Sequence, residues 1–293
     1  NIIYNNMFFR FCFCFCFCFL LFTFMVYSIQ MNLISILKSI ALGVLEGITE
    51  FLPVSSTGHL ILAGKVLKFE SLSGTFEISI QLGAIIAVLF LYKDFFAHQF
   101  KPSNWMSEGN RKMLVAVVPF LIVGFFGYSF IKSMFSETVV LISLIFGGVC
   151  MICTDIFVKN KSVKTCSFDE ISYKQALYIG LFQCFAFIPG MSRSGSTIVG
   201  GVLLGLDYKV ATKFSFLLSV PVMFCAVAYE LLKSFDSLTV SDLGLMGIAI
   251  VVSFFSGLAS MVFLIKMIEK WKLVPFGVYR IILGVIGLVI IFN

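Results

Sequence analysis

Nine apolar stretches follow one another along this chain, at residues 33–52, 76–92, 113–131, 139–157, 175–190, 196–206, 210–232, 243–265 and 275–292. Several of them reach the roughly 20 residues that a helix needs to cross a bilayer. The composition agrees, because 60% of the residues are hydrophobic and 12% are charged, whereas a water-soluble domain averages about 45–50% apolar and about 25% charged residues. The sequence therefore predicts an all-α integral membrane protein, and it excludes a soluble globular enzyme, a disordered chain and a disulfide-stapled secreted domain.

Residues 1–30 form a low-complexity hydrophobic extension with a Phe-Cys alternation. This stretch is apolar enough for an added anchor helix, and it lacks the small-residue cleavage site of a signal peptide. The alternative is upstream sequence translated ahead of a natural start at Met31. We take residues 31–293 as a single polytopic membrane domain.

Two of the apolar stretches are interrupted by Pro, Gly and Ser next to ionisable residues. The first break is Pro-Val-Ser-Ser-Thr-Gly at residues 53–58, and the second is Pro-Gly-Met-Ser-Arg-Ser-Gly at residues 189–195. Non-helical backbone at membrane depth is tolerated only where protein or a water-filled cavity satisfies its polar groups. The two breaks therefore predict two re-entrant helix hairpins that line a shared cavity.

The segments around the two breaks resemble each other at a separation of roughly 137 residues. In membrane proteins, broken segments at matching places in two halves point to a site at the repeat interface. We therefore expect an inverted repeat, with repeat 1 at about 31–160 and repeat 2 at about 170–293. The complete fold is then two re-entrant helix hairpins plus six transmembrane helices.

The distribution of positive charge tests this topology. The loops at 93–112, 158–174 and 266–273 fall on one side of the membrane and carry eleven Lys and Arg residues, against four on the other side. Because Lys and Arg collect in cytoplasmic loops, the first set of loops is expected inside the cell. The net charge of +6 then needs no nucleic acid as a partner.

Glu46 and Glu50 lie four residues apart, on one face of a helix that ends at the first break. Ionisable residues inside a membrane are costly and usually face a water-filled cavity with a functional role. Two neighbouring carboxylates repel unless they share a proton or a cation, so the pair is a candidate site for a divalent cation, Mg²⁺ or Ca²⁺. The alternative is a pair of interfacial carboxylates, salt-bridged to Lys38 or Lys65.

The first break also supplies a Ser/His pair. A Ser hydroxyl becomes a nucleophile when a neighbouring base removes its proton, and His is the usual base near neutral pH. The alternative is that the Ser/Thr cluster caps the next helix at Thr57, with His59 as a hydrogen-bonded core residue.

Arg193 lies in the Ser/Gly-rich turn of the second break, where a helix opens. A permanent cation beside hydroxyls and free backbone N–H groups suits a phosphate. The alternative is an Arg193 that pairs with Glu46 or Glu50 only to neutralise buried charge, which would still bring the two breaks together. Carboxylates for a metal, a Ser/His pair and an Arg aimed at an anion are the parts of a phosphoryl-transfer site.

Five further polar residues occur in or beside the apolar stretches. Gln183 occupies the place of Glu46 in the second repeat, and a neutral amide there would let the two halves specialise. The others are expected near helix ends, where they snorkel or pair at the interface: Glu77, Asp207, Glu230 and Arg280.

Residues 46–59 and 189–197 resemble the two motifs of the undecaprenyl-diphosphate phosphatase family, the membrane enzymes linked to bacitracin resistance, and the likeness extends from about Met31 to Asn293. The resemblance implies hydrolysis of undecaprenyl diphosphate to the monophosphate, which recycles the lipid carrier of cell-wall synthesis. It also implies a divalent cation, a fold that is often dimeric, and a multi-pass protein of the plasma (inner) membrane whose active site faces the outer, periplasmic side.

The resemblance also implies roles for individual residues. Glu46 and Glu50 match the family's essential carboxylates, and both are the expected metal ligands. The expected catalytic residues are Glu46, Glu50, the proposed nucleophile Ser56, His59 and the phosphate-binding Arg193. The expected substrate-binding residues are Ser55, Thr57, Ser192, Arg193, Ser194 and Thr197.

Two other classes of protein compete with a phosphatase. Inverted repeats with broken helices are typical of secondary transporters, so a transporter or lipid flippase fits the architecture equally well. A membrane scaffold with buried ion pairs is a third interpretation. The combination of Glu, Ser, His and Arg is more than an ion-coupled carrier needs, and it favours the phosphatase.

Overall fold

The computed structural model describes residues 32–69 and 75–292. The hydrophobic extension at residues 1–30 therefore lies outside the described residues. Within the described part, the regular elements are α-helices and short 3-10 turns, together with one isolated bridge between Thr165 and Leu206. The predicted all-α membrane architecture is confirmed.

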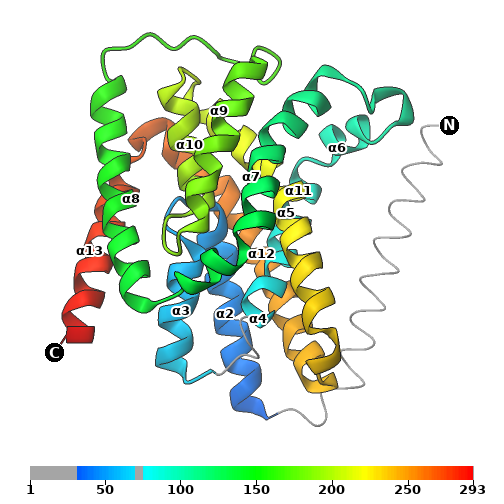
Figure 1. The fold of residues 1–293 in the computed structure, drawn as a ribbon, viewed down its shortest axis with the longest axis vertical. Helices are drawn as coiled ribbons and strands as arrows, with labels where there is room; N and C mark the ends of the chain where they lie inside the picture. The colour runs from blue at the N-terminus through cyan, green and yellow to red at the C-terminus, as the bar shows by residue number, and fades with distance from the viewer. Residues whose placement is uncertain (1–31, 70–74, 293) are drawn as a thin grey trace.

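The helices fall into long spans and shorter segments (Figure 1). The long helices are α2 (Leu33–Phe51), α7 (Glu108–Ser133), α8 (Glu137–Val158), α11 (Tyr208–Ser234), α12 (Val240–Trp271) and α13 (Val274–Phe292). The shorter ones are α3 (Ser56–Leu67), α4 (Thr75–Ser79), α5 (Gln81–Leu91), α6 (Lys93–Gln99), α9 (Tyr173–Gln183) and α10 (Arg193–Leu203). The 3-10 turns are η2 (Pro102–Asn104), η3 (Cys184–Phe187) and η4 (Phe235–Ser237).

Five helices in the described part are long and apolar enough to cross a bilayer: α7, α8, α11, α12 and α13. A sixth crossing is available if the segment Thr75–Leu91 is counted together with α6, to which it is joined at a bend of 84°. The six predicted spans thus correspond to five unbroken helices and one bent segment. The predicted stretch 76–92 is interrupted at Ile80, whereas its counterpart in the second half, α11, is continuous.

The two breaks predicted from the sequence each separate a pair of helices, α2 from α3 and α9 from α10. In Figure 1, α2 and α3 lie in the lower half of the molecule, and α9 and α10 lie in the upper half. The first helix of each pair packs along a distant long helix, α2 along α12 and α9 along α7. Glycine permits this close approach. A Cβ on Gly43 would lie 2.7 Å from the carbonyl oxygen of Ala249, and a Cβ on Gly180 would collide with the carbonyl oxygen of Ala116.

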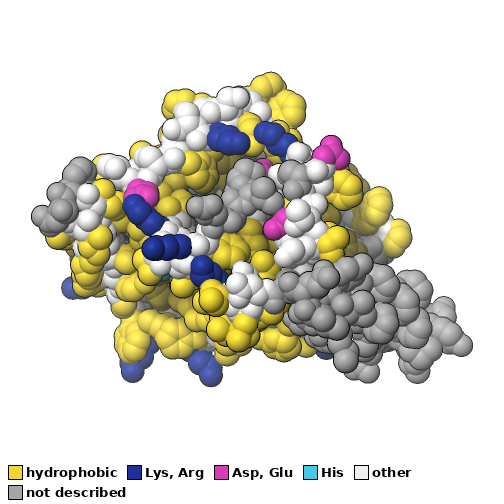
Figure 2. All heavy atoms as spheres, turned by 90° about the horizontal axis from the view of Figure 1, so that it is seen from below, with side chains coloured by type: hydrophobic (Ala, Val, Ile, Leu, Met, Phe, Trp, Pro, Cys, Tyr) yellow, Lys and Arg dark blue, Asp and Glu magenta, His cyan; other side chains and the backbone are white. Residues whose placement is uncertain are grey.

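The outer surface of the bundle is apolar. The side of α7 that faces outward carries exposed Leu121, Ile122, Phe125, Phe126 and Phe130, as expected for contact with lipid tails. Seen from below in Figure 2, mainly apolar side chains surround a few basic and acidic groups at the end of the molecule. The ion pair between Lys65 and Glu137 (2.7 Å) joins the end of α3 to the start of α8.

A buried carboxylate fixes the start of α13. Asp155 of α8 accepts hydrogen bonds from the backbone N–H groups of Leu273 (2.8 Å) and Val274 (2.9 Å). Its other oxygen accepts from the hydroxyl of Tyr208 (2.6 Å) at the start of α11. Orphan N–H groups at a helix start need such partners. The contact sets the position of α13 against α8, and this helix reaches the site described next.

Candidate active site

The two breaks fold into the same local structure. Ser55 and Ser192 are N-cap residues with positive φ values of 74° and 70°, and their hydroxyls accept the N–H groups of Gly58 (3.3 Å) and Gly195 (3.1 Å). The alternative that the Ser/Thr cluster caps this helix is confirmed, but the cap is Ser55 and not Thr57, because α3 begins at Ser56. A non-Gly residue at positive φ costs of order 1–3 kcal/mol and persists only where the surroundings enforce it.

Glu50, Arg193 and Ser56 meet where the two breaks come together. Arg193 Nη2 donates to Glu50 Oε1 at 2.9 Å, and both side chains are more than 90% buried. Ser56 donates its hydroxyl to the second carboxylate oxygen, Oε2, at 2.6 Å. The predicted contact between the breaks is confirmed, and Glu50 is the group positioned to accept the Ser56 proton.

The Lys residues considered as partners for the carboxylates lie elsewhere. Lys65 pairs with Glu137, and the ammonium of Lys38 donates to the carbonyl of Lys68 (3.1 Å). The interpretation of Glu46 and Glu50 as interfacial carboxylates salt-bridged to Lys38 or Lys65 is therefore wrong.

Glu46 is fully buried, and neither of its carboxylate oxygens has a hydrogen-bond partner among the described residues. A buried carboxylate without a partner is strongly unfavourable, so these oxygens are suited to a cation. No group of three or more His, Cys, Asp or Glu side chains in the described part could hold a metal ion. Mg²⁺, however, is commonly held by one or two carboxylates together with substrate phosphates and water, so Glu46 and Glu50 fit that arrangement.

His59 does not contact Ser56 in the way the sequence suggested. Its Nδ1 lies 2.7 Å from the carbonyl oxygen of Ser55, and its Nε2 lies 2.7 Å from the hydroxyl of Tyr279 on α13. Because a carbonyl oxygen only accepts, Nδ1 must carry a proton. Tyr279 was not predicted from the sequence as a site residue, although its position directly before Arg280 in an apolar stretch was a signal for it.

Most hydroxyls of the second break are already engaged within the protein. Ser194 donates to the carbonyl of Leu52 (3.1 Å), which links the two breaks directly. Thr197 bonds the hydroxyl of Ser215 (2.7 Å) and the carbonyl of Arg193 (3.0 Å). These hydroxyls, with the Ser192 cap, hold the turn that presents Arg193. Contact of these hydroxyls with the substrate stays a prediction, and so does contact of the half-buried Thr57 with it.

Arg280 has a different place from the one expected. It was predicted near a helix end, but it is fully buried on α13. Its guanidinium donates to the backbone carbonyls of Pro53 (3.4 Å), Ser143 (3.1 Å), Leu144 (3.2 Å), Gly190 (2.8 Å) and Met191 (2.9 Å). The prediction that Arg280 snorkels to the membrane interface is therefore wrong. Its hydrogen bonds instead join the first break, the second break and α8. Asp207 does lie at a helix end, where it caps α11.

Gln183, at the place of Glu46 in the second half, is also fully buried, and both of its amide atoms lack partners among the described residues. Glu46 and Gln183 thus occupy similar environments near the ends of α2 and α9. The Nε of Arg193 is a further buried donor without a partner there.

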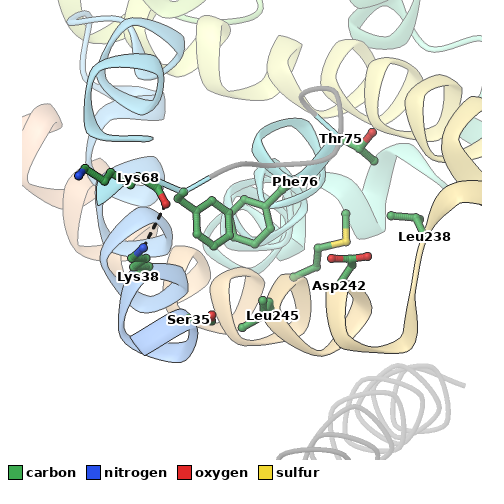
Figure 3. A pocket seen from close by; sticks show the side chains of 10 residues that line it. Ser35, Lys38, Lys68, Thr75, Phe76, Leu238, Asp242 and Leu245 are labelled. Carbon is green, nitrogen blue, oxygen red and sulfur yellow. Dashed lines mark hydrogen bonds between the residues drawn. The ribbon is translucent and has the colours of Figure 1, made fainter. Parts of the chain in front are cut away.

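A cavity of about 210 Å³ lies at the opposite end of α2 from Glu50 (Figure 3). It is lined by Ser35, Lys38, Lys68, Phe69, Thr75, Phe76, Leu238, Asp242, Leu245 and Met246. Figure 3 shows Lys38 reaching the Lys68 carbonyl on one wall, with Asp242 on the other. None of the predicted site residues lines this cavity.

Comparison with known proteins identifies the family. A family model described as "Bacitracin resistance protein BacA" matches residues 39–286. The chain belongs to this family. The BacA match confirms the resemblance seen in the two motifs.

Similar proteins extend over nearly the whole of this domain. A protein named undecaprenyl-diphosphatase from Sulfurihydrogenibium sp. is 45% identical over 252 residues, which is 85% of this chain and 97% of the relative. One of the same name from Wolinella succinogenes is 46% identical over 256 residues, 86% of this chain and 97% of the relative. A third, from Neisseria meningitidis, is 39% identical over 259 residues, 87% of this chain and 95% of the relative.

Proposed function

We propose that this BacA-family chain is an undecaprenyl-diphosphatase, which hydrolyses undecaprenyl diphosphate to undecaprenyl phosphate and inorganic phosphate. The observation that carries the proposal is the buried junction of the two breaks, where Arg193, Glu50 and Ser56 are in hydrogen-bond contact. The names of the relatives supply the substrate. The product is the lipid carrier that cell-wall synthesis uses again.

The junction of the two breaks is suited to bind an anion. The N-termini of α3 and α10 begin at the two breaks, and a helix N-terminus presents N–H groups and a positive dipole end to an anion. Arg193 adds a permanent charge with a planar set of donors that matches phosphate oxygens. A phosphate bound there competes with Glu50 for Arg193, which frees Glu50 to act as a base. The apolar outer faces of the helices accommodate the polyprenyl tail in the lipid.

The chemistry follows from the hydrogen bond between Ser56 and Glu50. Either the Ser56 oxygen or a water molecule attacks the terminal phosphorus, and the proton that is lost goes to Glu50 Oε2. The bond from that phosphorus to the bridging oxygen breaks, and undecaprenyl phosphate leaves. If Ser56 attacks, water then hydrolyses the phosphoserine to release inorganic phosphate. His59 contributes through Ser55 rather than by contact with the attacking oxygen.

A divalent cation, Mg²⁺ or Ca²⁺, is part of the proposal, with Glu46 and Glu50 as its protein ligands. The unpartnered oxygens of Glu46 support this assignment. When bound, the cation would supply charge neutralisation to the diphosphate.

The inverted repeat is also part of the proposal. Its support is the matched pair of Ser caps, the location of the two hairpins in opposite halves of the molecule (Figure 1), and the reciprocal packing of α2 on α12 and α9 on α7. With the Lys-rich loops inside the cell, the first hairpin enters from the outer side of the inner membrane, and the site opens to the periplasm. The homodimer expected from the resemblance stays a prediction.

Proteoliposomes distinguish the phosphatase from the transporter or flippase. Vesicles that contain the purified chain and a C55 polyprenyl diphosphate are expected to release inorganic phosphate, and vesicles without protein are not. Translocation of the intact diphosphate from one leaflet to the other, without phosphate release, would overturn the proposal and favour the flippase.

A further inference from the structure

Tyr279 has a hydrogen bond that the reaction described above leaves unexplained. Its hydroxyl lies 2.7 Å from Nε2 of His59, and the two rings are parallel, with an interplanar angle of 4°. Tyr279 is 45% exposed, whereas His59 is 8% exposed. The bond therefore joins a buried imidazole to a side chain at the edge of the bundle.

The protonation of His59 follows from its two partners. Nδ1 must donate, because the carbonyl of Ser55 has no proton to give. His59 forms no ion pair with the described residues, and a buried charged ring without a partner is costly. We therefore take the imidazole as neutral, with its single proton on Nδ1. Nε2 is then an acceptor, and it is the Tyr279 hydroxyl that donates to it.

The other end of this chain of hydrogen bonds is the strained turn before Ser56. Ser55 has a φ of 74°, which a non-Gly residue keeps only when its surroundings over-determine it. The His59 Nδ1–H holds the Ser55 carbonyl at 2.7 Å, and the next residue, Ser56, donates to Glu50 at 2.6 Å. The Ser55 carbonyl therefore sets the tautomer of His59, and the Tyr279 hydroxyl is the second anchor of the ring, which keeps Nδ1–H directed at that carbonyl.

We propose that Tyr279 is a positioning residue, whose hydroxyl anchors the His59 ring through Nε2 and so keeps Nδ1–H against the carbonyl of Ser55, in the conformation that aims Ser56 at Glu50. Tyr279 acts through His59 and does not need to touch the substrate. α13 then supplies two adjacent residues to the site: Arg280 fixes the backbone of the breaks, and Tyr279 fixes the orientation of the His59 ring.

The chain offers a direct spectroscopic test, because it contains only two His residues. The second, His98, lies on α6 and contacts Asn104, so it serves as an internal reference. Nitrogen-15 NMR of the full chain with labelled His reports which ring nitrogen carries the proton. For the wild type we expect the Nδ1–H tautomer at His59. In Tyr279→Phe, which keeps the ring and removes only the hydroxyl, we expect Nδ1 to stay protonated, the Nε2 signal to shift because its hydrogen bond is lost, and Nδ1–H to exchange faster with solvent, while the His98 signal is unchanged.

Kinetics provide the second measurement, and this arm rests on the proposed phosphatase function. We expect kcat of Tyr279→Phe to fall by about 3- to 10-fold, the range that corresponds to one hydrogen bond, with KM within about twofold of the wild-type value. Tyr178→Phe is the matched control, because Tyr178 is similarly exposed and its hydroxyl has no hydrogen bond to the described residues. It should leave both kcat and the His59 spectrum unchanged.

Two results would overturn the inference: His59 ring signals and an Nδ1–H exchange rate that are the same in Tyr279→Phe and the wild type, or an equal loss of kcat in Tyr279→Phe and Tyr178→Phe. A wild-type chain that binds the diphosphate and releases no phosphate would instead refute the proposed function, and the NMR result would still decide the role of Tyr279.

Discussion

Replacement of Arg280 by Met should destabilise the protein and disorder the site together. The guanidinium donates to five backbone carbonyls. Three of these, on Pro53, Gly190 and Met191, lie in the breaks and outside any helix, so helical N–H groups do not satisfy them. Met fills a similar volume but leaves these acceptors buried without a donor.

The size of the effect follows from those three bonds. A hydrogen bond to a charged group contributes about 1.5–3 kcal/mol, and a buried acceptor left without its partner costs about 1–3 kcal/mol. We therefore expect Arg280→Met to lower the free energy of unfolding by about 4 kcal/mol or more. Arg280→Lys keeps the charge but has fewer donors in a different geometry. Its free energy of unfolding should lie between those of Arg280→Met and the wild type.

The assay is reversible unfolding in mixed detergent micelles, followed by phosphate release at a temperature where each variant is folded. Arg111→Met is the control, because Arg111 is an exposed residue on α7 and its replacement should change stability by less than about 0.5 kcal/mol. If Arg280→Met unfolds with the same free energy as Arg111→Met and retains full kcat, Arg280 does not hold the breaks together.

Two further predictions concern packing and charge. Gly180→Ala places a methyl group against the Ala116 carbonyl and should lower the free energy of unfolding by about 1–3 kcal/mol. Gly247→Ala is the control, because a Cβ there would meet nothing within 4 Å, and it should be neutral or slightly stabilising. Equal effects of the two substitutions would argue against the close approach of α9 and α7. Arg193→Ala should reduce phosphate release more than 100-fold, and near-normal turnover would remove Arg193 from phosphate binding.

The sequence predicted the helical membrane fold, because apolar stretches and intramembrane breaks are local patterns with few structural solutions. It also predicted that the two breaks meet, because interrupted backbone at membrane depth needs protein or a shared cavity to satisfy its polar groups. The pairing of Arg193 with Glu50, which was the alternative to phosphate binding, brings the two breaks together.

The remaining contacts depend on tertiary structure. The position of Arg280 was predicted wrongly, because a hydropathy pattern indicates how deep a residue lies along a helix. It does not indicate which neighbouring carbonyl groups accept hydrogen bonds from that residue. His59 was expected to face Ser56, because residues so close in sequence suggested a direct pair. The turn at Ser55 instead directs the ring to Tyr279, which is 220 residues away in the chain. Neither partner could be inferred without the packing of α13.

The most direct test of the account is phosphate release from a C55 polyprenyl diphosphate by purified protein, with and without a chelator, beside Glu50→Gln. Gln is similar in size but cannot accept the Ser56 proton as a carboxylate does, and it is a weaker ligand for a hard cation. We expect release that the chelator abolishes, that added Mg²⁺ or Ca²⁺ restores, and that Glu50→Gln lacks. Release that persists in the chelator and in folded Glu50→Gln would contradict both the acidic metal site and the role of Glu50 as the base.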